Sequence, residues 1–517
     1  MYHCALVRLR LFGPLLAAAL CSTATAAALP NTATAARVLV LGPGARTIVR
    51  DDPFLSAQAV TPAPSPGAPP ALTAPPTRIA PPAPTAAAAA PATAARRPPR
   101  KPRRTTWSEL TRLYEAGSIS NTTYVGDSAL LRSAVVAVRR LKGARATQLE
   151  AVLRTLDSIA AAGQLTPSRL PALFLTLARN LQWWTTGPLL SYGQRVEFAG
   201  SQLVWEYYPG QGIQLQELGN FGKADGLLSA GAAAHGQLQG LLSELIPLAA
   251  SRAGGLTWEY YFNFDGGRPP WTSAMSQATA LEALTRAYKA SGDRSYLAIA
   301  HRALALFTTA PPLGVFVKTP AGARYLQYSF APATDIINAF LQSLIGLYDY
   351  AQASADPEAA ALFAAGNAQA QLELPHFDTG AWSLYQPGSE DTLGYHELVT
   401  GFLQELCQRT SAPAYCVTAA HFSSYLRTPP TLQLLTSRAR IDKPAKIYFR
   451  LSKYSHVGIV VSSASRTVLL TSAYFPYGID DFSLPALKAG GTDAVRLAAT
   501  DLAGNFARIQ GTLTVTR

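Results

Sequence analysis

Six segments with helical spacing of apolar residues follow one another in the second half of the chain, and this run most constrains the fold. In approximate numbers the segments are 273–291, 294–309, 333–353, 357–373, 395–409 and 413–426. Amphipathic helices joined by short loops with glycine or proline pack as antiparallel neighbours. We expect them to close as an incomplete α/α toroid, with a substrate groove at one rim.

The first hundred residues have a different composition. Residues 1–28 combine Arg8 and Arg10 with an apolar stretch and an alanine-rich end, which is typical of a secretory signal peptide. The apolar run is short for a membrane span, so we expect no stable span in the mature chain. The sequence therefore predicts a secreted protein or one associated with the cell surface.

Residues 29–104 are expected to be a linker rich in proline and alanine, because this composition lacks the varied apolar surface that folding requires. A short apolar segment at 37–42 either forms a hairpin or stays extended. The linker ends in the basic run from Arg96 to Arg104, which supplies much of the formal net charge of +13. Such a tail suits nonspecific attraction to an anionic wall polymer, or is only a solvated spacer, and it does not indicate nucleic-acid binding.

The remaining chain is expected to divide in two. Residues 105–430 form the helical domain, with further helices over 106–186 and strands with a turn over 195–221. Residues 431–517 show short alternating apolar runs, which predict a small β-sandwich of the immunoglobulin-like kind. The predicted fold class is mainly α with added β: a toroid with short substrate-facing hairpins, followed by this sandwich.

Two cysteines, Cys407 and Cys416, lie beyond the signal peptide, on either side of an eight-residue segment that contains Pro413. In an oxidising compartment a disulfide that closes this loop is favoured over two buried thiols. No second pair with ligand spacing is present, so we expect no metal site.

Tyrosines occupy every segment between Trp271 and His396 that is expected to face a substrate, and Tyr328, Tyr385 and Tyr395 stand in loops or at a helix start. Phenol rings stack on sugar faces and their hydroxyls bond sugar oxygens. A phenol of lowered pKa also exchanges a proton with carbon. This pattern favours carbohydrate chemistry.

The string Trp-Glu-Tyr-Tyr occurs at 205–208 and again at 258–261. We expect a pair of short hairpins that face the substrate, although the flanks do not match as a true repeat would. Their candidate binding residues are Glu206, Tyr208, Glu259 and Tyr261.

Residues from Trp258 to about Tyr425 resemble the C-terminal domain of the glucuronyl C5-epimerase family, over roughly a third of the chain. The matching strings are Trp271–Gln277, Pro332–Asn338, Leu374–Gly380 and Tyr395-His396. The chain thus resembles an exported, bacterial-type member that carries an immunoglobulin-like module.

The resemblance implies an isomerase without a cofactor that acts on an acidic polysaccharide. The family removes the proton from carbon 5 of a glucuronyl unit and returns one to the opposite face. Tyr328, Tyr385 and Tyr395 fall at the positions of its functional tyrosines. A tyrosine with its ordinary pKa near 10 is a poor base, so nearby cations are expected to lower that pKa. The candidate cations are Arg268, Arg324 and His396, and the further candidate binding residues are Trp271, Gln277, Gln327 and Asn338.

The chain departs from the family pattern at three positions: Gln327 replaces an acidic residue, Gly394 an aspartate and Val399 a histidine. Either the tyrosines alone run the chemistry, with Glu206 or Glu259 supplying an acid, or the activity is altered or lost. The alternatives are a catalytically silent glycan-binding or wall-associated protein, and a uronan lyase, in which abstraction at carbon 5 is followed by elimination.

Overall fold

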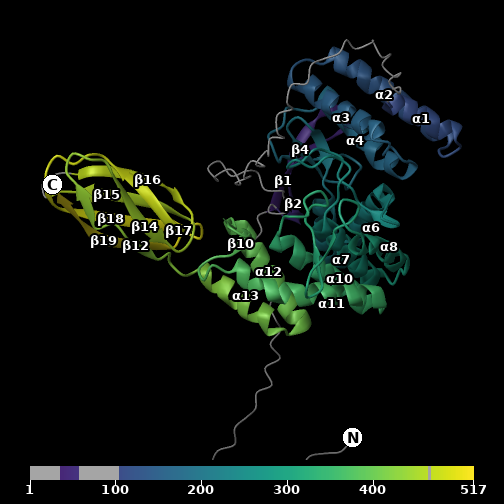
Figure 1. The fold of residues 1–517 in the computed structure, drawn as a ribbon. Helices are drawn as coiled ribbons and strands as arrows, with labels where there is room; N and C mark the ends of the chain where they lie inside the picture. The colour runs from purple at the N-terminus through teal and green to yellow at the C-terminus, as the bar shows by residue number, and fades with distance from the viewer. Residues whose placement is uncertain (1–34, 57–103, 464–466) are drawn as a thin grey trace, which may run out of the picture.

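The computed structural model describes residues 35–56, 104–463 and 467–517 (Figure 1). The expected signal peptide and the basic run before Arg104 lie outside these residues. Within them, no helix has both the length and the apolar character needed to cross a membrane.

The first folded helices form a group that packs around Leu149, Leu156 and Ile159. The capping box of Thr105 and Ser108 starts the first helix where the proline-rich stretch ends. The helices are α1 (Thr106–Glu115), α2 (Asn121–Arg140), α3 (Ala144–Ala161) and α4 (Leu170–Thr186).

A five-stranded sheet combines two strands that precede these helices in the chain with three that come after them, in the order β2-β1-β3-β4-β5. Its strands are β1 (Ala35–Leu41), β2 (Thr47–Ser56), β3 (Arg195–Phe198), β4 (Trp205–Tyr208) and β5 (Gly212–Leu215). β1 and β2 form a hairpin, and β1 also pairs in parallel with β3, from Val38 opposite Arg195 to Leu41 opposite Phe198.

Assigning residues 29–104 to a linker is therefore wrong for residues 35–56. Two features hold the hairpin in the fold. Val38 is fully buried in a small cluster with Leu55, and the buried Lys223 pairs with Asp52 at 3.0 Å and with Glu197 of β3 at 2.9 Å.

The larger group of helices surrounds α7 and α10, both of which are buried along most of their length. A Cβ atom on Gly346 of α10 would lie 2.2 Å from the carbonyl oxygen of Ala278 of α7, so the glycine permits the close approach of these helices. The helices are α5 (Glu217–Ser229), α6 (His235–Leu245), α7 (Ala274–Ser291), α8 (Ser295–Ala303), α9 (Ala305–Thr308), α10 (Ile337–Ser354), α11 (Pro357–Glu373), α12 (Leu393–Thr410) and α13 (Pro413–Tyr425). A disulfide joins Cys407 of α12 to Cys416 of α13, the pairing favoured from the sequence.

Three short hairpins connect these helices: β6 (Ala250–Arg252) with β7 (Gly255–Thr257), β8 (Phe316–Lys318) with β9 (Ala323–Tyr325), and β10 (Leu384–Gln386) with β11 (Ser389–Glu390). The second Trp-Glu-Tyr-Tyr string is not one of them. The chain at that string folds back through two isolated antiparallel bridges, Tyr260 with Trp271 and Phe264 with Gly267, whereas the first string is strand β4 of the five-stranded sheet. Both strings therefore lie where the chain turns back on itself, but only the first forms a regular strand.

The C-terminal region is strand-rich, as expected, and lies to one side of the helices in Figure 1. Its strands are β12 (Leu432–Leu434), β13 (Arg438–Arg440), β14 (Ala445–Leu451), β15 (Ser455–Ser462), β16 (Thr467–Phe475), β17 (Gly478–Leu484), β18 (Gly491–Asp501) and β19 (Phe506–Thr516). They form two sheets, β12-β14-β17 and β13-β19-β18-β15-β16. Both sheets contribute to one core, which contains Phe449 from the first and Val457 and Leu497 from the second.

The C-terminal strands contact the helical part at the β10-β11 hairpin. The carboxylate of Glu390 accepts the backbone N–H groups of Tyr454 and Tyr477, each at 2.8 Å. The buried Lys453 pairs with Asp501 at 2.7 Å and lies 5.2 Å from the ring centre of Trp382. This junction therefore supports the segment that carries Tyr385 and Tyr395.

Candidate active site

Three tyrosines from separate elements meet in the structure. Tyr328 lies in the loop after β9, Tyr385 in β10 and Tyr395 in the first turn of α12. The ring centres of Tyr385 and Tyr395 are 5.3 Å apart, and the phenols of Tyr328 and Tyr385 are hydrogen-bond partners. Tyr328 is buried, whereas Tyr385 and Tyr395 are partly exposed, so the cluster opens to solvent on the side of the latter two.

Burial makes all three tyrosines weaker acids than an ordinary phenol. It raises the pKa of Tyr328 to about 12, against the opposing hydrogen bonds of Tyr385 and Gln327. Burial also raises the pKa of Tyr385 well above its usual 10, and raises that of Tyr395. The expectation that cations lower these pKa values is not met, and the three phenols are neutral at pH 7.

The two arginines expected to lower these pKa values do not act on the tyrosines in this way. Arg324 pairs with Glu373 and, at 3.1 Å, with Asp335. Arg268 is exposed. None of the expected cations is among the main groups that shift the pKa of the three tyrosines.

His396 is a buried structural residue. Its ring stacks on Trp382 with the ring centres 3.8 Å apart. Its two nitrogens contact Ser383 Oγ at 2.7 Å and the carbonyl oxygen of Phe422 at 2.9 Å. Burial lowers its pKa to about 4, so the ring is neutral at pH 7.

Glu206 of β4 is one of the acidic residues whose charge acts on the tyrosine cluster, together with Asp391 and Asp265. It lies 3.6 Å from Arg195 Nε, and both side chains are buried. Burial raises the pKa of Glu206 to about 7, although Arg195, Tyr208 and Gln216 favour its charged form. Its charge contributes in turn to the raised pKa of Tyr395. Glu206 therefore titrates in the neutral range beside the cluster.

Tyr208 belongs to the same neighbourhood. Its hydroxyl accepts a hydrogen bond from Gln216 Nε2 at 3.0 Å, and its ring stacks on Phe262 with centres 4.5 Å apart. The edge of Tyr192 packs on it at 5.9 Å. Sequence reasoning missed Tyr192, Arg195 and Gln216, and only their proximity in the chain to the Trp-Glu-Tyr-Tyr string could have indicated them.

Glu259 and Tyr261, by contrast, belong to a buried ion cluster. Arg169 donates to both carboxylate oxygens of Glu259 at 2.7 and 2.9 Å, Arg252 donates at 2.7 Å, and the Tyr261 hydroxyl donates at 2.9 Å. This set of contacts satisfies the carboxylate inside the fold. A substrate-binding role for Glu259 and Tyr261 is therefore not supported.

The other candidate binding residues differ in position. Trp271 stacks on Tyr260 at 4.3 Å and meets Tyr328 edge-on at 5.8 Å, so it forms one wall of the tyrosine cluster. Gln327 is partly exposed and is hydrogen-bonded to Tyr328. Gln277 is buried and donates to the carbonyl oxygen of Leu256 at 2.8 Å, which is a structural role.

Asn338, at the start of α10, is buried, and within the described part of the chain its side-chain amide has no hydrogen-bond partner. Burying an amide without a partner is costly. Substrate binding by Asn338 therefore stays a prediction.

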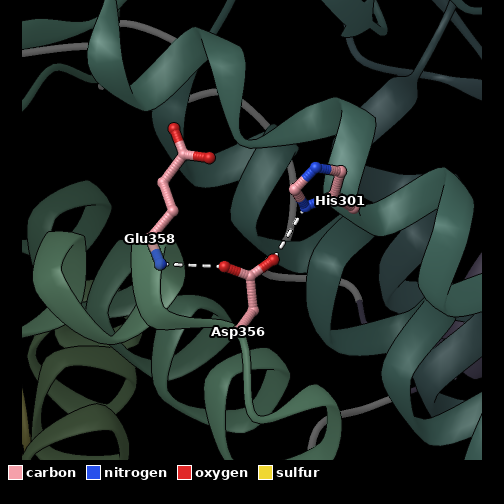
Figure 2. A group of neighbouring side chains, drawn as sticks. All are labelled: His301, Asp356 and Glu358. Atoms are coloured by element: carbon pink, nitrogen blue, oxygen red, sulfur yellow. Dashed lines mark hydrogen bonds and ion pairs between the residues drawn. The ribbon is translucent and has the colours of Figure 1, made fainter.

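One group with the composition of a metal site occurs among the described residues: His301 of α8 with Asp356 and Glu358 at the start of α11 (Figure 2). Its potential ligand atoms lie within 4.8 Å of one another. Asp356 already caps α11, because Oδ1 accepts the N–H groups of Glu358 and Ala359. Its Oδ2 lies 2.7 Å from His301 Nδ1. These contacts explain the group without an ion.

Comparison with known families agrees with this geometry. The sequence profile described as the D-glucuronyl C5-epimerase C-terminus matches residues 254–424. That segment belongs to this family. It contains Tyr328, Tyr385 and Tyr395, together with helices α7 to α12 and most of α13.

Two curated proteins match part of the chain. The D-glucuronyl C5-epimerase of Caenorhabditis elegans is 35% identical over 130 residues, which are 23% of this chain and 21% of that protein. An uncharacterized protein of Methanocaldococcus jannaschii is 27% identical over 147 residues, 27% of this chain and 46% of that protein. The chain therefore spans between about a fifth and a half of these relatives' length.

Among solved structures, the cellobiose 2-epimerase of Bacillus thermoamylovorans is similar over 41% of this chain and 59% of that chain, at 13% identity and a TM-score of 0.32.

The C5-epimerase segment supplies only part of the neighbourhood just described. Glu206 and Tyr208 come from the sheet at 195–215, and Tyr192 from the turn before it, all outside the matched residues. The sheet and the segment share one continuous core, which explains how residues far apart in the chain surround the same tyrosines.

Proposed function

We propose that this protein is a uronyl C5-epimerase that acts on an acidic polysaccharide without a cofactor. The observation that carries the proposal is the meeting of Tyr328, Tyr385 and Tyr395 in a cluster that is partly open to solvent. Membership of residues 254–424 in the C5-epimerase family supports it.

The reaction moves one proton at a time and changes no oxidation state. A base takes the proton from carbon 5, and the electron pair of that C–H bond delocalises into the adjacent carboxylate. An acid on the other face then donates a proton to carbon 5, which inverts the centre. Groups on both faces of the ring, and hydrogen-bond donors at the carboxylate, are therefore required.

Neutral phenols suit the donating half of this cycle. A phenol with a pKa of about 12, such as Tyr328, is a proton donor and a hydrogen-bond donor to a developing enolate. The abstracting half requires a phenolate, and a phenolate that forms in the complex would be stabilised by the amide of Gln327 and the hydroxyl of Tyr385. Glu206, with a pKa of about 7, is a group in this neighbourhood able to hold the displaced proton.

The test is solvent exchange. The full chain is incubated with a glucuronyl polymer in D2O, and deuterium at carbon 5 and new iduronyl units are measured by NMR. We expect exchange in the wild type and a loss of at least about a hundredfold in rate in Tyr328→Phe, Tyr385→Phe and Tyr395→Phe, because general acid–base groups contribute roughly 10²–10⁴-fold.

Tyr114→Phe is the matched control, because Tyr114 stacks on Tyr124 away from these residues and keeps that stacking as phenylalanine. Its rate should equal that of the wild type. Exchange that survives the loss of any two site hydroxyls would refute the assignment.

A second candidate is a silent glycan-binding protein, which the neutral Gln327 and the raised tyrosine pKa values favour. It predicts saturable binding to a uronic-acid polymer with no deuterium at carbon 5. A uronan lyase would instead release an unsaturated uronyl product that absorbs in the ultraviolet, and the same incubation would reveal it.

We further propose that the helical part is an incomplete α/α toroid and that the two C-terminal sheets are an immunoglobulin-like sandwich. The proposed site of action is outside the cell or at its surface. Support comes from the signal-like N-terminal sequence and from the basic run at 96–104, which suits an anionic wall polymer.

A further inference from the structure

The outward face of the five-stranded C-terminal sheet has an ordered set of side chains. Strand pairing aligns them in rows across β16, β15, β18 and β19. One row reads Tyr474, His456, Thr500 and Phe506, and the next reads Ser472, Gly458, Ala498 and Arg508. The second row is nearly free of large side chains at its centre, so the face has a trough there.

The trough is an open groove of about 980 Å³. Two aromatic rings flank it: Tyr474 is 59% exposed and Phe506 is 55% exposed. Tyr474 is held in place by stacking on Tyr454 at 5.5 Å and by an edge contact with His456 at 5.0 Å. Fixed, exposed rings beside a groove are surfaces on which sugar rings stack.

The same face has one sign of charge. Arg496 and Arg508 line the groove, and Arg438 and Arg440 project from β13 at the far end of the sheet. Arg496 Nε donates to Gln510 Oε1 at 3.1 Å, which orients its guanidinium. Side chains of β18 point alternately inward and outward. Asp493 and Asp501 occupy inward, buried positions, whereas Arg496 occupies an outward, exposed one. Among the described residues, the outward positions of these strands therefore hold arginines and no acid.

We propose that this face is a binding surface for an acidic polysaccharide chain. Guanidinium groups hold carboxylates by paired hydrogen bonds, and the flanking rings accept sugar faces. An extended polymer fits a trough that runs across several strands, whereas an apolar protein partner would have to bury unpaired arginines. The choice of a uronic-acid polymer rests on the proposed function, and the surface would concentrate that polymer near the tyrosines.

The test is binding of the full chain to hyaluronan, an alternating uronic-acid polymer, with neutral dextran and poly-L-glutamate as comparison ligands. Affinity electrophoresis or calorimetry should show binding to hyaluronan and none to dextran. Arg496→Glu/Arg508→Glu should weaken hyaluronan binding at least about tenfold.

The control is Arg427→Glu/Arg450→Glu, which makes the same change in net charge at two exposed arginines away from the trough, one before the strands and one on β14 of the smaller sheet. It should bind like the wild type. Tyr474→Ala/Phe506→Ala should weaken binding to hyaluronan severalfold and leave binding to poly-L-glutamate unchanged.

The proposal is overturned if the wild type does not bind hyaluronan, or if the control loses as much affinity as Arg496→Glu/Arg508→Glu. It is overturned as well if Tyr474→Ala/Phe506→Ala weakens binding to hyaluronan and to poly-L-glutamate equally. It is also overturned if the charge reversal changes the oligomeric state by light scattering, since the face would then be a protein contact. Failure of the proposed catalysis is separable, because Tyr395→Phe should keep hyaluronan binding, while Arg496→Glu/Arg508→Glu should keep deuterium exchange on a short oligosaccharide.

Discussion

A buried chain of three polar side chains lies directly behind Tyr395, and counting its protons fixes their states. His396 Nε2 lies 2.9 Å from the carbonyl oxygen of Phe422, which only accepts, so Nε2 carries the hydrogen. The ring is neutral, and Nδ1 is thus the acceptor of the Ser383 hydroxyl at 2.7 Å. Ser383 Oγ also lies 2.6 Å from Asp391 Oδ2. Its one hydrogen is already used, so Asp391 must be the protonated partner.

The pKa of Asp391 agrees with this count, because burial raises it from 3.8 to about 7. The neutral carboxyl is the form that the folded protein accommodates. Its contribution to stability is therefore complete below the unfolded pKa of about 4 and is lost as the pH rises from there through 7, at roughly 1.4 kcal/mol per pH unit.

Asp391→Asn should remove this dependence, since asparagine does not titrate. We expect the free energy of unfolding of the wild type, minus that of the variant, to fall by about 3 kcal/mol between pH 5 and pH 8. Urea unfolding at the two pH values measures the difference. A constant difference would mean that Asp391 is ionised throughout, contrary to the proton count.

The neighbours Tyr395 and His396 also show what the sequence could and could not predict about single residues. Tyr395 and His396 are neighbours in a string shared with the family, and both were expected to face substrate. Successive residues on a helix point about 100° apart, so one faces the tyrosine cluster and the other the core. Residue types were predictable from the sequence, and their directions were not.

At the scale of elements, the β10-β11 hairpin links the tyrosine cluster to the C-terminal strands. Lys453 has its charge buried between Asp501, the face of Trp382 and the carbonyl oxygens of Tyr425 and Thr428. A buried ion pair of this kind is costly to break, because the partner that remains keeps an uncompensated charge.

Lys453→Met should therefore lower the free energy of unfolding by about 3–5 kcal/mol, and it should also slow deuterium exchange, since Trp382 stacks on the residue next to Tyr395 in sequence. Lys446→Met is the control, because Lys446 is an exposed lysine of β14 whose pair with Asp481 is screened by solvent and contributes little to stability. Equal effects of the two substitutions on stability would contradict a supporting role for the junction.

The β1-β2 hairpin offers a test of the revised boundary at residues 35–56. Val38 is fully buried and Val49 is 54% exposed, although both belong to the same hairpin. Val38→Asp should cost several kcal/mol through a buried, unpaired carboxylate, and Val49→Asp about 0.5 kcal/mol or less. Thermal unfolding distinguishes the two variants. Indistinguishable unfolding midpoints for the two variants would mean that residues 35–56 belong to the linker after all.

Over the whole molecule, local signals predicted the helices well. The expected 273–291 and 357–373 correspond to α7 (Ala274–Ser291) and α11 (Pro357–Glu373), because Ser273 and Asp356 cap those helices through their side chains. The expected helix 294–309 is instead divided into α8 and α9. Local reasoning offered a hairpin at residues 37–42, and β1 does pair with β2. It could not predict that β1 also pairs with β3, more than 150 residues away. The same holds for Glu206, whose nearness to Tyr395 depends on that sheet.

The bonds that join the C-terminal strands to the helices are made largely to main-chain atoms. Glu390 holds two peptide N–H groups, Lys453 holds two peptide carbonyls, and Asn505 Nδ2 donates to the carbonyl oxygen of Leu426 at 3.0 Å. An attachment of this kind depends on the course of the backbone, and the identities of Tyr454 and Tyr477 hardly enter it. Relatives would be free to vary those two tyrosines independently, and a transplanted module that keeps the two turns, Lys453 and Asn505 would attach as firmly as the native one.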